Sequence, residues 1–340
     1  MFGTPRWIGC GSSEKLQAGW VELREVAYMK RVLLAGALCF GLLAVVTWAW
    51  GGDGKRSGSS SEVMQPKAES QSADPVLVGA GDIASCDDLA GAEATAKLIE
   101  KIPGTVFAAG DLAYPDGSDE QFAKCYAPTW GRFKDRTRPA PGNHEYHKSG
   151  ASGYARYFGA AAGDPSKAYY SYELGTWHIV VLNSECAEVG GCDAASPQGK
   201  WLREDLEQHP VACTLAYFHK PLFSSGGKHG SNPEMKPLWD TLYGAGADVI
   251  LNGHDHDYER FAPQDPEGHA DAKRGIREFV VRSGGKNSHR KMGEAKANSE
   301  IRNDDTFGVL KLTLRPAGYD WEFVPEAGKT FTDTGRGSCH

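Results

Sequence analysis

The amino-acid sequence predicts an α/β sandwich in which two sheets each pack against helices. From Pro75 onward, short apolar runs alternate with helical stretches, and the runs 75–82 and 104–111 end in the same Gly-Asp pair. This repetition is typical of βαβ units in a sheet that contains parallel strands. Nearer the carboxyl end, residues 306–326 alternate apolar and polar side chains, which indicates a β-hairpin.

The first half of the predicted fold begins with a buried strand. PVLVGAGD (75–82) is a continuous apolar run, as expected for a strand that is covered on both faces. The residues AEATAKLIEKI (92–102) predict a helix, and GTVFAAGD (104–111) predicts the next strand. TRPAPGNHE (137–145) is another segment that ends in polar residues. Residues 168–183 have the pattern of a β-hairpin.

The second half continues the alternation. Residues 196–209 predict a helix in which Ser196 caps the amino end and Pro197 occupies the first turn. We find neither a second catalytic domain nor a repeat of fixed period. The other predicted elements are a strand at 213–220, a helix at 234–246, and strands at 247–255 and 277–285.

Composition and charge narrow the class of protein. The 340 residues are 40% hydrophobic and 24% charged, which is ordinary for a globular protein. The formal net charge is -7, whereas a surface that holds nucleic acid usually carries a basic stripe. No nucleic-acid binding is therefore expected. An anionic substrate would have to be attracted by a local positive site.

The amino-terminal quarter predicts export. Residues 32–50 are uncharged and apolar, and Met29-Lys30-Arg31 precedes them, which is the pattern of a secretion signal or a membrane anchor. Both interpretations remain open, so the protein is expected to be periplasmic, extracellular or membrane-anchored through 32–50. Residues 1–28 are an amino-terminal extension. Two interpretations of it fit equally: translation begins at Met29, so that the extension is not made, or the extension is a short cytoplasmic tail. The glycine- and serine-rich segment 52–74 predicts a flexible tether, and 75–340 predicts one catalytic domain.

Eight cysteines occur in the chain, and six of them follow the tether. In an oxidising compartment these cysteines are expected to form disulfides. The short glycine-containing loop between Cys186 and Cys192 favours one pairing, and Cys86 with Cys125 is the second choice. Cys213, inside an apolar strand, is predicted to be a buried free thiol. A zinc site built from cysteines is disfavoured because the sequence contains no CxxC.

Potential metal ligands follow several of the predicted strands. Active sites of open α/β sheets gather beyond the carboxyl ends of the strands, so these residues are expected to share one pocket. Each residue alone has an ordinary explanation as a turn former, a cap or a core side chain. Their recurrence, mostly behind glycine, is what indicates a site. The segments are Gly81-Asp82, Gly110-Asp111 with Tyr114, Gly142-Asn143-His144-Glu145, His219, and Gly253-His254-Asp255-His256.

The ordered series GDIA, GDLAY, GNHE, FHKP and GHDHDYER resembles the calcineurin-like metallophosphoesterases, and most closely the purple acid phosphatases. The resemblance spans about residues 76–325. Tyr114, three residues after Asp111, and the Tyr-Glu-Arg that follows His256 point to the purple branch. The resemblance implies a four-layer α/β/β/α sandwich of two mixed sheets flanked by helices. The first motif, GDIASC, departs from the family pattern, which usually has glycine two places after the aspartate.

The resemblance also implies a site for two metal ions. Asp111 would bridge them, and the first ion, Fe(III), would be held by the side chains of Asp82, Tyr114 and His256. A phenolate is a hard, strongly donating anion, so it suits a highly charged cation that can deprotonate it. The second ion would be divalent (Zn, Mn or Fe). Its other ligands would be Asn143, His219 and His254.

The implied activity is hydrolysis of small-molecule phosphate monoesters by attack of a metal-bound hydroxide. Two aspartates, one phenolate and one hydroxide carry a formal charge of about −4, against about +5 for the two ions, so the site stays positive. His144, next to Asn143, is the expected contact for the phosphate or the leaving group. His229, on the glycine-rich loop after FHKP, is a further expected catalytic residue.

The remaining charged residues near these motifs have supporting roles in this interpretation. Asp255 lies between two ligand histidines and would point away from the metals in an extended segment. Glu145 and Arg260 are expected to hold loops, while Lys220 fits a phosphate contact and a structural role equally. Two other functions stay open: a phosphodiesterase or nucleotide-hydrolysing enzyme, and a non-catalytic tethered module that binds metal or phosphate.

Overall fold

The computed structural model describes residues 73–281, 283–286 and 292–340. The predicted extension 1–28, the signal or anchor at 29–51, and nearly all of the tether lie outside the described residues. In the ranges that are described, none of the helices is long and apolar enough to cross a membrane.

The strands of the described residues form a six-stranded sheet, a seven-stranded sheet and a two-stranded ladder. In the six-stranded sheet the order is β15-β14-β13-β1-β3-β5, and in the seven-stranded sheet it is β12-β10-β11-β9-β8-β7-β6. The first sheet contains β1 (Val76–Ala80), β3 (Thr105–Ala109), β5 (Thr137–Ala140), β13 (Gly308–Arg315), β14 (Gly318–Pro325) and β15 (Thr334–Ser338). The second contains β6 (Tyr170–Leu174), β7 (Trp177–Val181), β8 (Cys213–Tyr217), β9 (Val249–Asn252), β10 (Tyr258–Phe261), β11 (Arg277–Val281) and β12 (Ser299–Asn303). The ladder pairs β2 (Ala84–Ser85) with β4 (Ala113–Tyr114).

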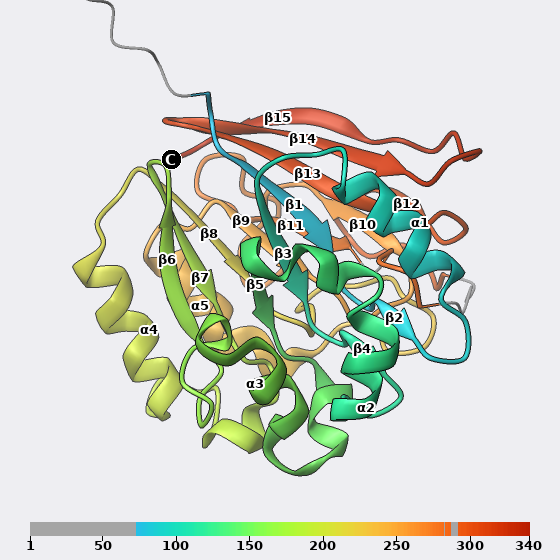
Figure 1. Cartoon of the computed structure of the whole chain (residues 1–340). Helices are drawn as coiled ribbons and strands as arrows, with labels where there is room; N and C mark the ends of the chain where they lie inside the picture. The colour runs from blue at the N-terminus through green and yellow to red at the C-terminus, as the bar shows by residue number, and fades with distance from the viewer. Residues whose placement is uncertain (1–72, 282, 287–291) are drawn as a thin grey trace, which may run out of the picture. The chain divides into compact units, whose positions relative to one another are not determined.

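Both sheets are mixed, and helices cover them, which confirms the predicted four-layer sandwich (Figure 1). Strands β1, β3 and β5 are parallel to one another, as are β7, β8, β9 and β11. Parallel pairing brings the carboxyl ends of neighbouring strands to one edge of a sheet. The helices are α1 (Ala90–Ile99), α2 (Asp119–Gln121), α3 (Ser152–Phe158), α4 (Pro197–Gln208) and α5 (Lys236–Gly244).

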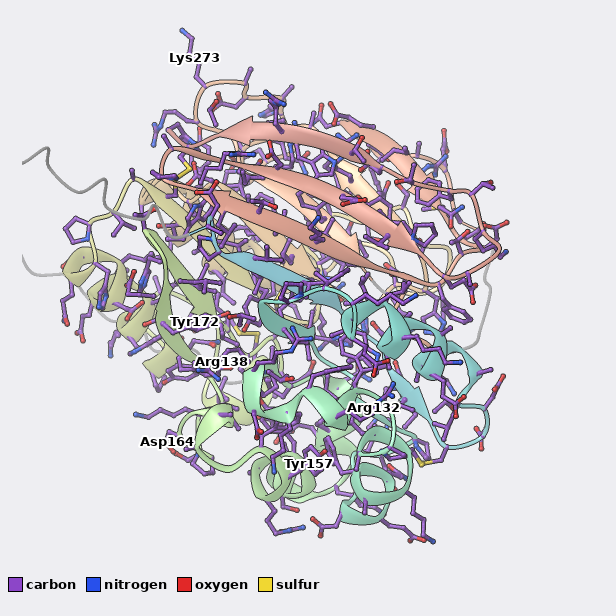
Figure 2. The ribbon with its side chains drawn as sticks, turned by 45° about the horizontal axis from the view of Figure 1, so that its top comes forward. Arg132, Arg138, Tyr157, Asp164, Tyr172 and Lys273 are labelled. Atoms are coloured by element: carbon purple, nitrogen blue, oxygen red, sulfur yellow. A yellow bond between two sulfur atoms is a disulfide. The ribbon has the colours of Figure 1, made fainter. Side chains whose placement is uncertain are left out.

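Alternation along the central strands of the seven-stranded sheet produces two cores. Ile179 and Leu215 belong to the core shared with the six-stranded sheet, whereas their neighbours Val180 and Ala216 pack with α4 and α5. Successive side chains of a strand point to opposite faces, so one apolar run serves both layers. Across the sheets, Arg138 of β5 lies over the ring of Tyr172 of β6, 5.7 Å from its centroid (Figure 2).

The hairpins and the longer helices agree with the prediction. Strands β6 and β7 pair antiparallel, as do β13 and β14. Helix α4 begins as expected: the hydroxyl of Ser196 accepts a hydrogen bond from the backbone N–H of Gly199, and Pro197 occupies the first turn.

The short helices between Ser118 and Ala162 were not predicted. They include the 3-10 helix Trp130–Arg136, and none of them is long enough to show a helical period. Packing stabilises them instead, because Phe122 stacks on Tyr157 at 4.9 Å between ring centroids. Tyr157 is labelled in Figure 2, and the ammonium of Lys134 lies 4.6 Å from its ring centroid.

The disulfides confirm two expectations and correct a third. Cys86 pairs with Cys125, and Cys186 pairs with Cys192. The prediction that Cys213 is a free thiol is wrong, because Cys213 pairs with Cys339. Cys213 begins β8, and the chain after β15 returns beside it, an approach that no local sequence pattern indicates.

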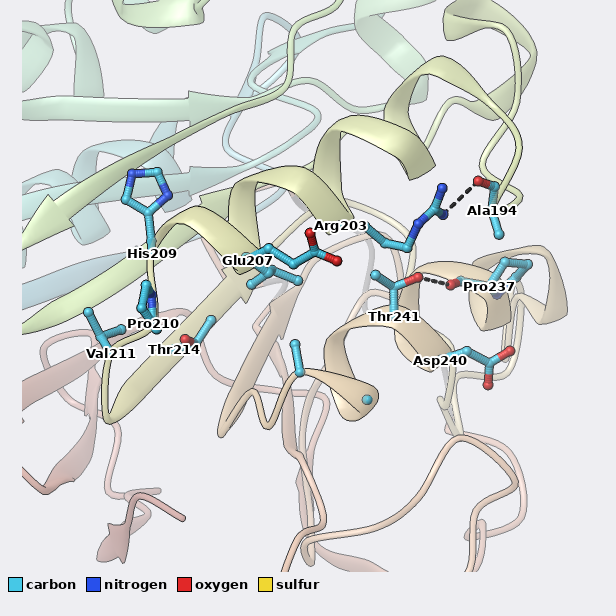
Figure 3. A pocket seen from close by; sticks show the side chains of 13 residues that line it. Ala194, Arg203, Glu207, His209, Pro210, Val211, Thr214, Pro237, Asp240 and Thr241 are labelled. Atoms are coloured by element: carbon cyan, nitrogen blue, oxygen red, sulfur yellow. Dashed lines mark hydrogen bonds between the residues drawn. The ribbon is translucent and has the colours of Figure 1, made fainter. Parts of the chain in front are cut away.

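A groove of about 770 Å³ lies between α4 and α5 (Figure 3). Arg203 and Glu207 of α4 face Thr241 and Asp240 of α5 across it, and Thr214, near the start of β8, also lines it. The candidate ligand His219 follows the carboxyl end of β8. The groove therefore reaches the start of β8, whereas the predicted site lies beyond the other end of that strand.

Next to this groove, a cluster of charged residues joins the β6–β7 hairpin to α4. The ring nitrogens of His178 lie 2.8 Å from carboxylate oxygens of Glu173 and Asp205. Carboxylates only accept hydrogen bonds, so His178 carries two protons and is an imidazolium. The ring of His209 lies 4.5 Å away and nearly parallel, at 11°. Because a metal binds in the plane of an imidazole, two parallel rings do not converge on one ion.

We expect His178→Gln to destabilise the protein in a pH-dependent way. Burial alone would lower the pKa of His178, but hydrogen bonds to Asp205 and Glu173 raise the pKa above its ordinary value. A histidine whose pKa is higher in the folded than in the unfolded protein stabilises the fold. This stabilisation is fully present below the unfolded-state pKa of about 6.5, and it is lost as the pH rises through the folded-state pKa. Burial raises the pKa of Asp205, yet His178 and Ser171 lower the pKa overall, so its contribution is lost in acid instead.

The expected cost of the substitution is thus about 1 to 2 kcal/mol near pH 5 to 6.5, and it shrinks in alkali. Thermal unfolding measured over a series of pH values checks this expectation. His269→Gln, at an exposed histidine paired with Asp265, is the matched control. A difference between wild type and His178→Gln that does not vary with pH would contradict the imidazolium assignment.

Candidate metal centre

Five of the seven predicted metal ligands contact one another beyond the carboxyl ends of the strands: Asp82, Asp111, Tyr114, His219 and His254. Asp82 follows β1, Asp111 follows β3, and His219 follows β8. Carboxylate oxygens of the two aspartates and a ring nitrogen of His219 lie within 4.8 Å of one another, and all three residues are buried. Buried carboxylates this close together need a positive partner.

The backbone at this centre is strained. Asp82, Asp111 and His254 have φ values of 57°, 54° and 73°, in the left-handed region that residues with a Cβ rarely adopt. Such conformations cost of order 1 kcal/mol or more each, and they concentrate at functional sites. The neighbouring hydrogen bonds hold them, for example the 2.8 Å bond from the backbone N–H of His254 to Oδ2 of Asp82.

Asp111 is the centre of the contacts. Oδ2 of Asp111 lies 3.2 Å from Nε2 of His219. The phenol of Tyr114 donates to the same oxygen at 3.0 Å and to Oδ1 of Asp82 at 2.5 Å. Burial alone would raise the pKa of Asp111, but the charges of His219 and His144 hold the pKa well below its usual range. Asp111 is therefore a carboxylate.

His219 has its tautomer fixed for binding a cation. Its Nδ1 lies 2.9 Å from the backbone carbonyl of Ala109, which can only accept, so Nδ1 carries a proton and Nε2 faces Asp111. Burial opposes protonation at Nε2, yet Asp111 raises the pKa of His219 to about 10. A proton on Nε2 of His219 thus balances the negative charge of Asp111. A metal ion bound at that position would balance the same charge.

His254 completes a pair with His219. Its Nδ1 lies 3.2 Å from Nε2 of His219, close to the separation of neighbouring ligands around one ion with bonds of about 2.1 Å. Burial and the charges of His219 and His229 lower the pKa of His254 to about 2. The imidazole is neutral, which is the form that binds metals.

Asn143 gives the clearest test of whether the residues fit a metal. Its Oδ1 is shielded from solvent, and no group of the described residues donates a hydrogen bond to it. A buried amide oxygen without a donor costs free energy, whereas amide oxygens are normal ligands of divalent ions. Together with the nitrogen pair of His219 and His254, this donor set fits the implied divalent ion.

Glu145 holds the two ligand loops together, as predicted. The backbone N–H of Gly142 donates to Oε2 at 2.8 Å, and that of Leu112 donates to Oε1 at 2.8 Å. The N–H of Asp111 also donates to Oε2, at 2.9 Å. Burial and the charge of Asp111 raise the pKa of Glu145 to about 8, although these N–H groups favour the carboxylate.

His144 lies beside the ligands. Its ring contacts Tyr114 at 4.3 Å between centroids, and its Nε2 is 3.7 Å from Oδ2 of Asp111. Nδ1 of His144 lies 2.6 Å from the carbonyl of Pro115, which orients Nε2 toward the centre. His147, which we did not predict as a site residue, lies with its ring centroid 4.5 Å from that of His144, tilted by 53°, and contacts the same carbonyl.

The segment after β9 departs from the prediction. Period-two alternation was expected through His256, but β9 ends at Asn252 and the chain turns at His254. Asp255 is buried and accepts hydrogen bonds from the hydroxyl of Ser224, at 2.5 Å, and from the backbone N–H of His229, at 3.2 Å. Asp255 therefore holds the glycine-rich loop instead of pointing outward as in an extended strand.

That loop places His229 next to the predicted ligands. The His229 ring lies 4.2 Å from the ring of His254 and 6.1 Å from that of His256. His256 is half-buried and His229 is exposed. The loop histidine and the strand-end histidines come together although the sequence between them gives no periodic signal.

Arg260, which was expected to hold a loop, and its neighbour Glu259 both make supporting contacts. Glu259 accepts hydrogen bonds from the backbone N–H and the hydroxyl of Ser225, and Arg260 pairs with Asp333 at 2.7 Å. Lys220, for which two roles were open, pairs with Glu185 at 3.1 Å and with Glu234 at 3.2 Å. Its ammonium thus has structural partners.

Comparisons with known proteins agree with the geometry. Among curated proteins, the chain is 28% identical over 200 residues to purple acid phosphatase 15 of Arabidopsis thaliana, covering 48% of this chain and 37% of that protein. It is 27% identical over 180 residues to acid phosphatase type 7 of Homo sapiens, covering 45% and 40%. The chain thus spans less than half the length of these relatives.

A solved structure shares the fold. The purple acid phosphatase PPD1 from yellow lupin seeds superposes with a TM-score of 0.59 at 20% identity, covering 79% of this chain and 54% of that one. The model of the calcineurin-like phosphoesterase family matches residues 77–258, from β1 into β10, which is more than half of the chain. The chain therefore belongs to the calcineurin-like phosphoesterase family, and sequences similar to it are purple acid phosphatases.

Proposed function

We propose that this chain is a dinuclear metal-dependent phosphatase that hydrolyses small-molecule phosphate monoesters. The observation that carries the proposal is the buried convergence of Asp82, Asp111 and His219, together with the undonated amide oxygen of Asn143. An iron(III) ion would be held by Asp82, Tyr114 and His256, and a divalent ion by Asn143, His219 and His254, with Asp111 between them. Two such ions supply charge for binding phosphate and generate a hydroxide nucleophile from water.

The side chains around the ions have separate tasks. His144 has its Nδ1 proton on the carbonyl of Pro115, so it can donate from Nε2 to a leaving oxygen only as an imidazolium. His229, whose ring lies 4.2 Å from that of His254, would contact the phosphate or the leaving group. The hydrogen bond from the backbone N–H of His144 to Oδ1 of Asp111, at 2.8 Å, fixes both residues relative to each other.

Two other functions compete with this proposal. A phosphodiesterase or nucleotide-hydrolysing enzyme could use the same ligands, since the ions recognise phosphate in both. A tethered, non-catalytic module that binds metal or phosphate is the alternative from another class. The neutral imidazole of His254 and the fixed tautomer of His219 suit metal coordination, which these functions share, so turnover is what separates them.

We expect the metal-loaded protein to hydrolyse p-nitrophenyl phosphate faster than bis(p-nitrophenyl) phosphate. A visible tyrosinate-to-Fe(III) absorption band should accompany activity and disappear in Tyr114→Phe. Faster cleavage of the diester would favour the phosphodiesterase, and metal-replete protein without turnover would favour the binding module. Colourless, fully active protein that contains two divalent ions would refute the iron assignment alone.

A further inference from the structure

Lys286 places a positive charge beside the metal centre, from a part of the chain that the ligand motifs do not include. It lies beyond β11, and its ammonium is 4.9 Å from the ring centroid of Tyr114. The same ammonium donates to the hydroxyl of Ser85 at 2.8 Å. Since the phenol of Tyr114 contacts both Asp82 and Asp111, the cation stands directly beside the predicted ligands.

The backbone that carries Lys286 is fixed to the strand end that carries Asp82. The N–H of Lys286 donates to the carbonyl of Asp82 at 2.9 Å, and the N–H of Gly284 donates to the carbonyl of Gly81 at 3.1 Å. The hydroxyl of Thr95, from α1, donates to the carbonyl of Gly284 at 2.6 Å. The base of the side chain is thus preorganised, while its four-carbon stem can still move the ammonium.

Two histidines also lie close to Tyr114. The ring of His144 contacts Tyr114 at 4.3 Å, and His147 continues the row at 4.5 Å from His144. In the proposed function, the two metal ions and His144 would hold the scissile phosphate. Lys286, which contacts Ser85 and the ring of Tyr114, adds a positive charge that this arrangement does not use.

We propose that Lys286 forms a second anion-binding point next to the metal centre, which binds a further anionic group attached to the scissile phosphate. A substrate with adjacent phosphates, such as a diphosphate, would use this point, whereas a monoester of an uncharged alcohol would not. A lysine ammonium is a common point-charge ligand of phosphate oxygens. The inference rests on the proposed function and assigns the residue that would give it substrate preference.

The test compares Lys286→Met and Lys286→Arg with wild type on inorganic pyrophosphate and on p-nitrophenyl phosphate. Loss of a charge-assisted hydrogen bond is expected to lower kcat/KM for pyrophosphate roughly 10- to 100-fold, mainly through KM. The value for p-nitrophenyl phosphate should change less than about threefold. Arginine should restore most of the pyrophosphate activity. Lys124→Met removes an exposed lysine that pairs with Glu120 and controls for net charge.

Binding provides a readout that does not need turnover. Calorimetry with methylenediphosphonate and with methylphosphonate, on protein whose metal content has been measured, should show weaker binding of the diphosphonate alone in Lys286→Met. Equal losses for both ligands, or no loss for either, would overturn the proposal. If Lys286→Met weakens binding of the diphosphonate alone while the wild-type protein hydrolyses no phosphate ester, the proposed function fails and the anion-binding point stands.

Discussion

Asp111→Asn is expected to lower kcat/KM at least about 1000-fold and to release metal from the protein. The carboxylate contacts Tyr114, His219 and the backbone N–H of His144, so it stands at the centre of the constellation. The substitution changes little except charge, because asparagine has nearly the same shape and tolerates the left-handed backbone well. The amide would remove the carboxylate that lies 3.2 Å from Nε2 of His219. Metal content measured beside steady-state rates checks the expectation.

The control for this change is Asp240→Asn, which alters an exposed aspartate of α5 paired with Lys236. It removes the same charge from the surface, and it should leave rates and metal content unchanged. If Asp111→Asn retained wild-type turnover with two bound ions, the bridging role would be wrong. If it lost one ion but kept measurable activity, the centre would need only a single metal.

Gly142→Ala is expected to reduce kcat/KM by at least about 100-fold, although the substitution adds only a methyl group. A Cβ at Gly142 would lie 2.3 Å from Oδ1 of Asp111 and 2.9 Å from Cδ2 of His219. The backbone itself, at φ −118° and ψ −173°, would accept alanine. The loss of activity therefore comes from steric overlap, because either Asp111 or the Asn143 loop must shift to make room for the methyl group. Near the reacting groups, a displacement of about 1 Å is enough to cost 100-fold.

Gly244→Ala is the matched control. No described atom lies within 4 Å of a Cβ at this position, which is the last residue of α5. Alanine there should leave activity unchanged and keep or slightly raise thermal stability. Activity and metal content of both variants, measured at equal folded fraction by circular dichroism, separate a local displacement from unfolding. Wild-type activity in Gly142→Ala would contradict this expectation, because it would mean that the ligand loops can accommodate the added methyl group.

The sequence allowed the main ligand segments to be predicted because local rules generate them. A continuous apolar run ends in glycine and then in a polar residue, and parallel strands bring such ends together, as for Asp82 and Asp111. The hairpins and α4 were predictable for the same reason, since their periodicity and capping residues are local.

What escaped prediction depends on contacts between distant parts of the chain. Lys286 reaches Ser85 across 201 residues, and Cys339 reaches Cys213 across 126. The turn at His254 is held by Oδ2 of Asp82, a hydrogen bond that no pattern in GHDHDYER encodes. The prediction from period-two alternation assumes an extended strand. It was wrong at His254, where a hydrogen bond to a distant carboxylate holds the backbone in the left-handed region.

The pairing of Cys213 with Cys339 has a consequence for the covalent connectivity of the chain. Residues 213–339 form a closed ring that includes His219, His254 and Lys286, so this part of the protein has no loose end that could separate. A protease that cuts one surface loop within the ring would open it without releasing a fragment. The Cys213–Cys339 disulfide would keep both pieces joined, so His219 and His254 would remain on one molecule until that disulfide was reduced.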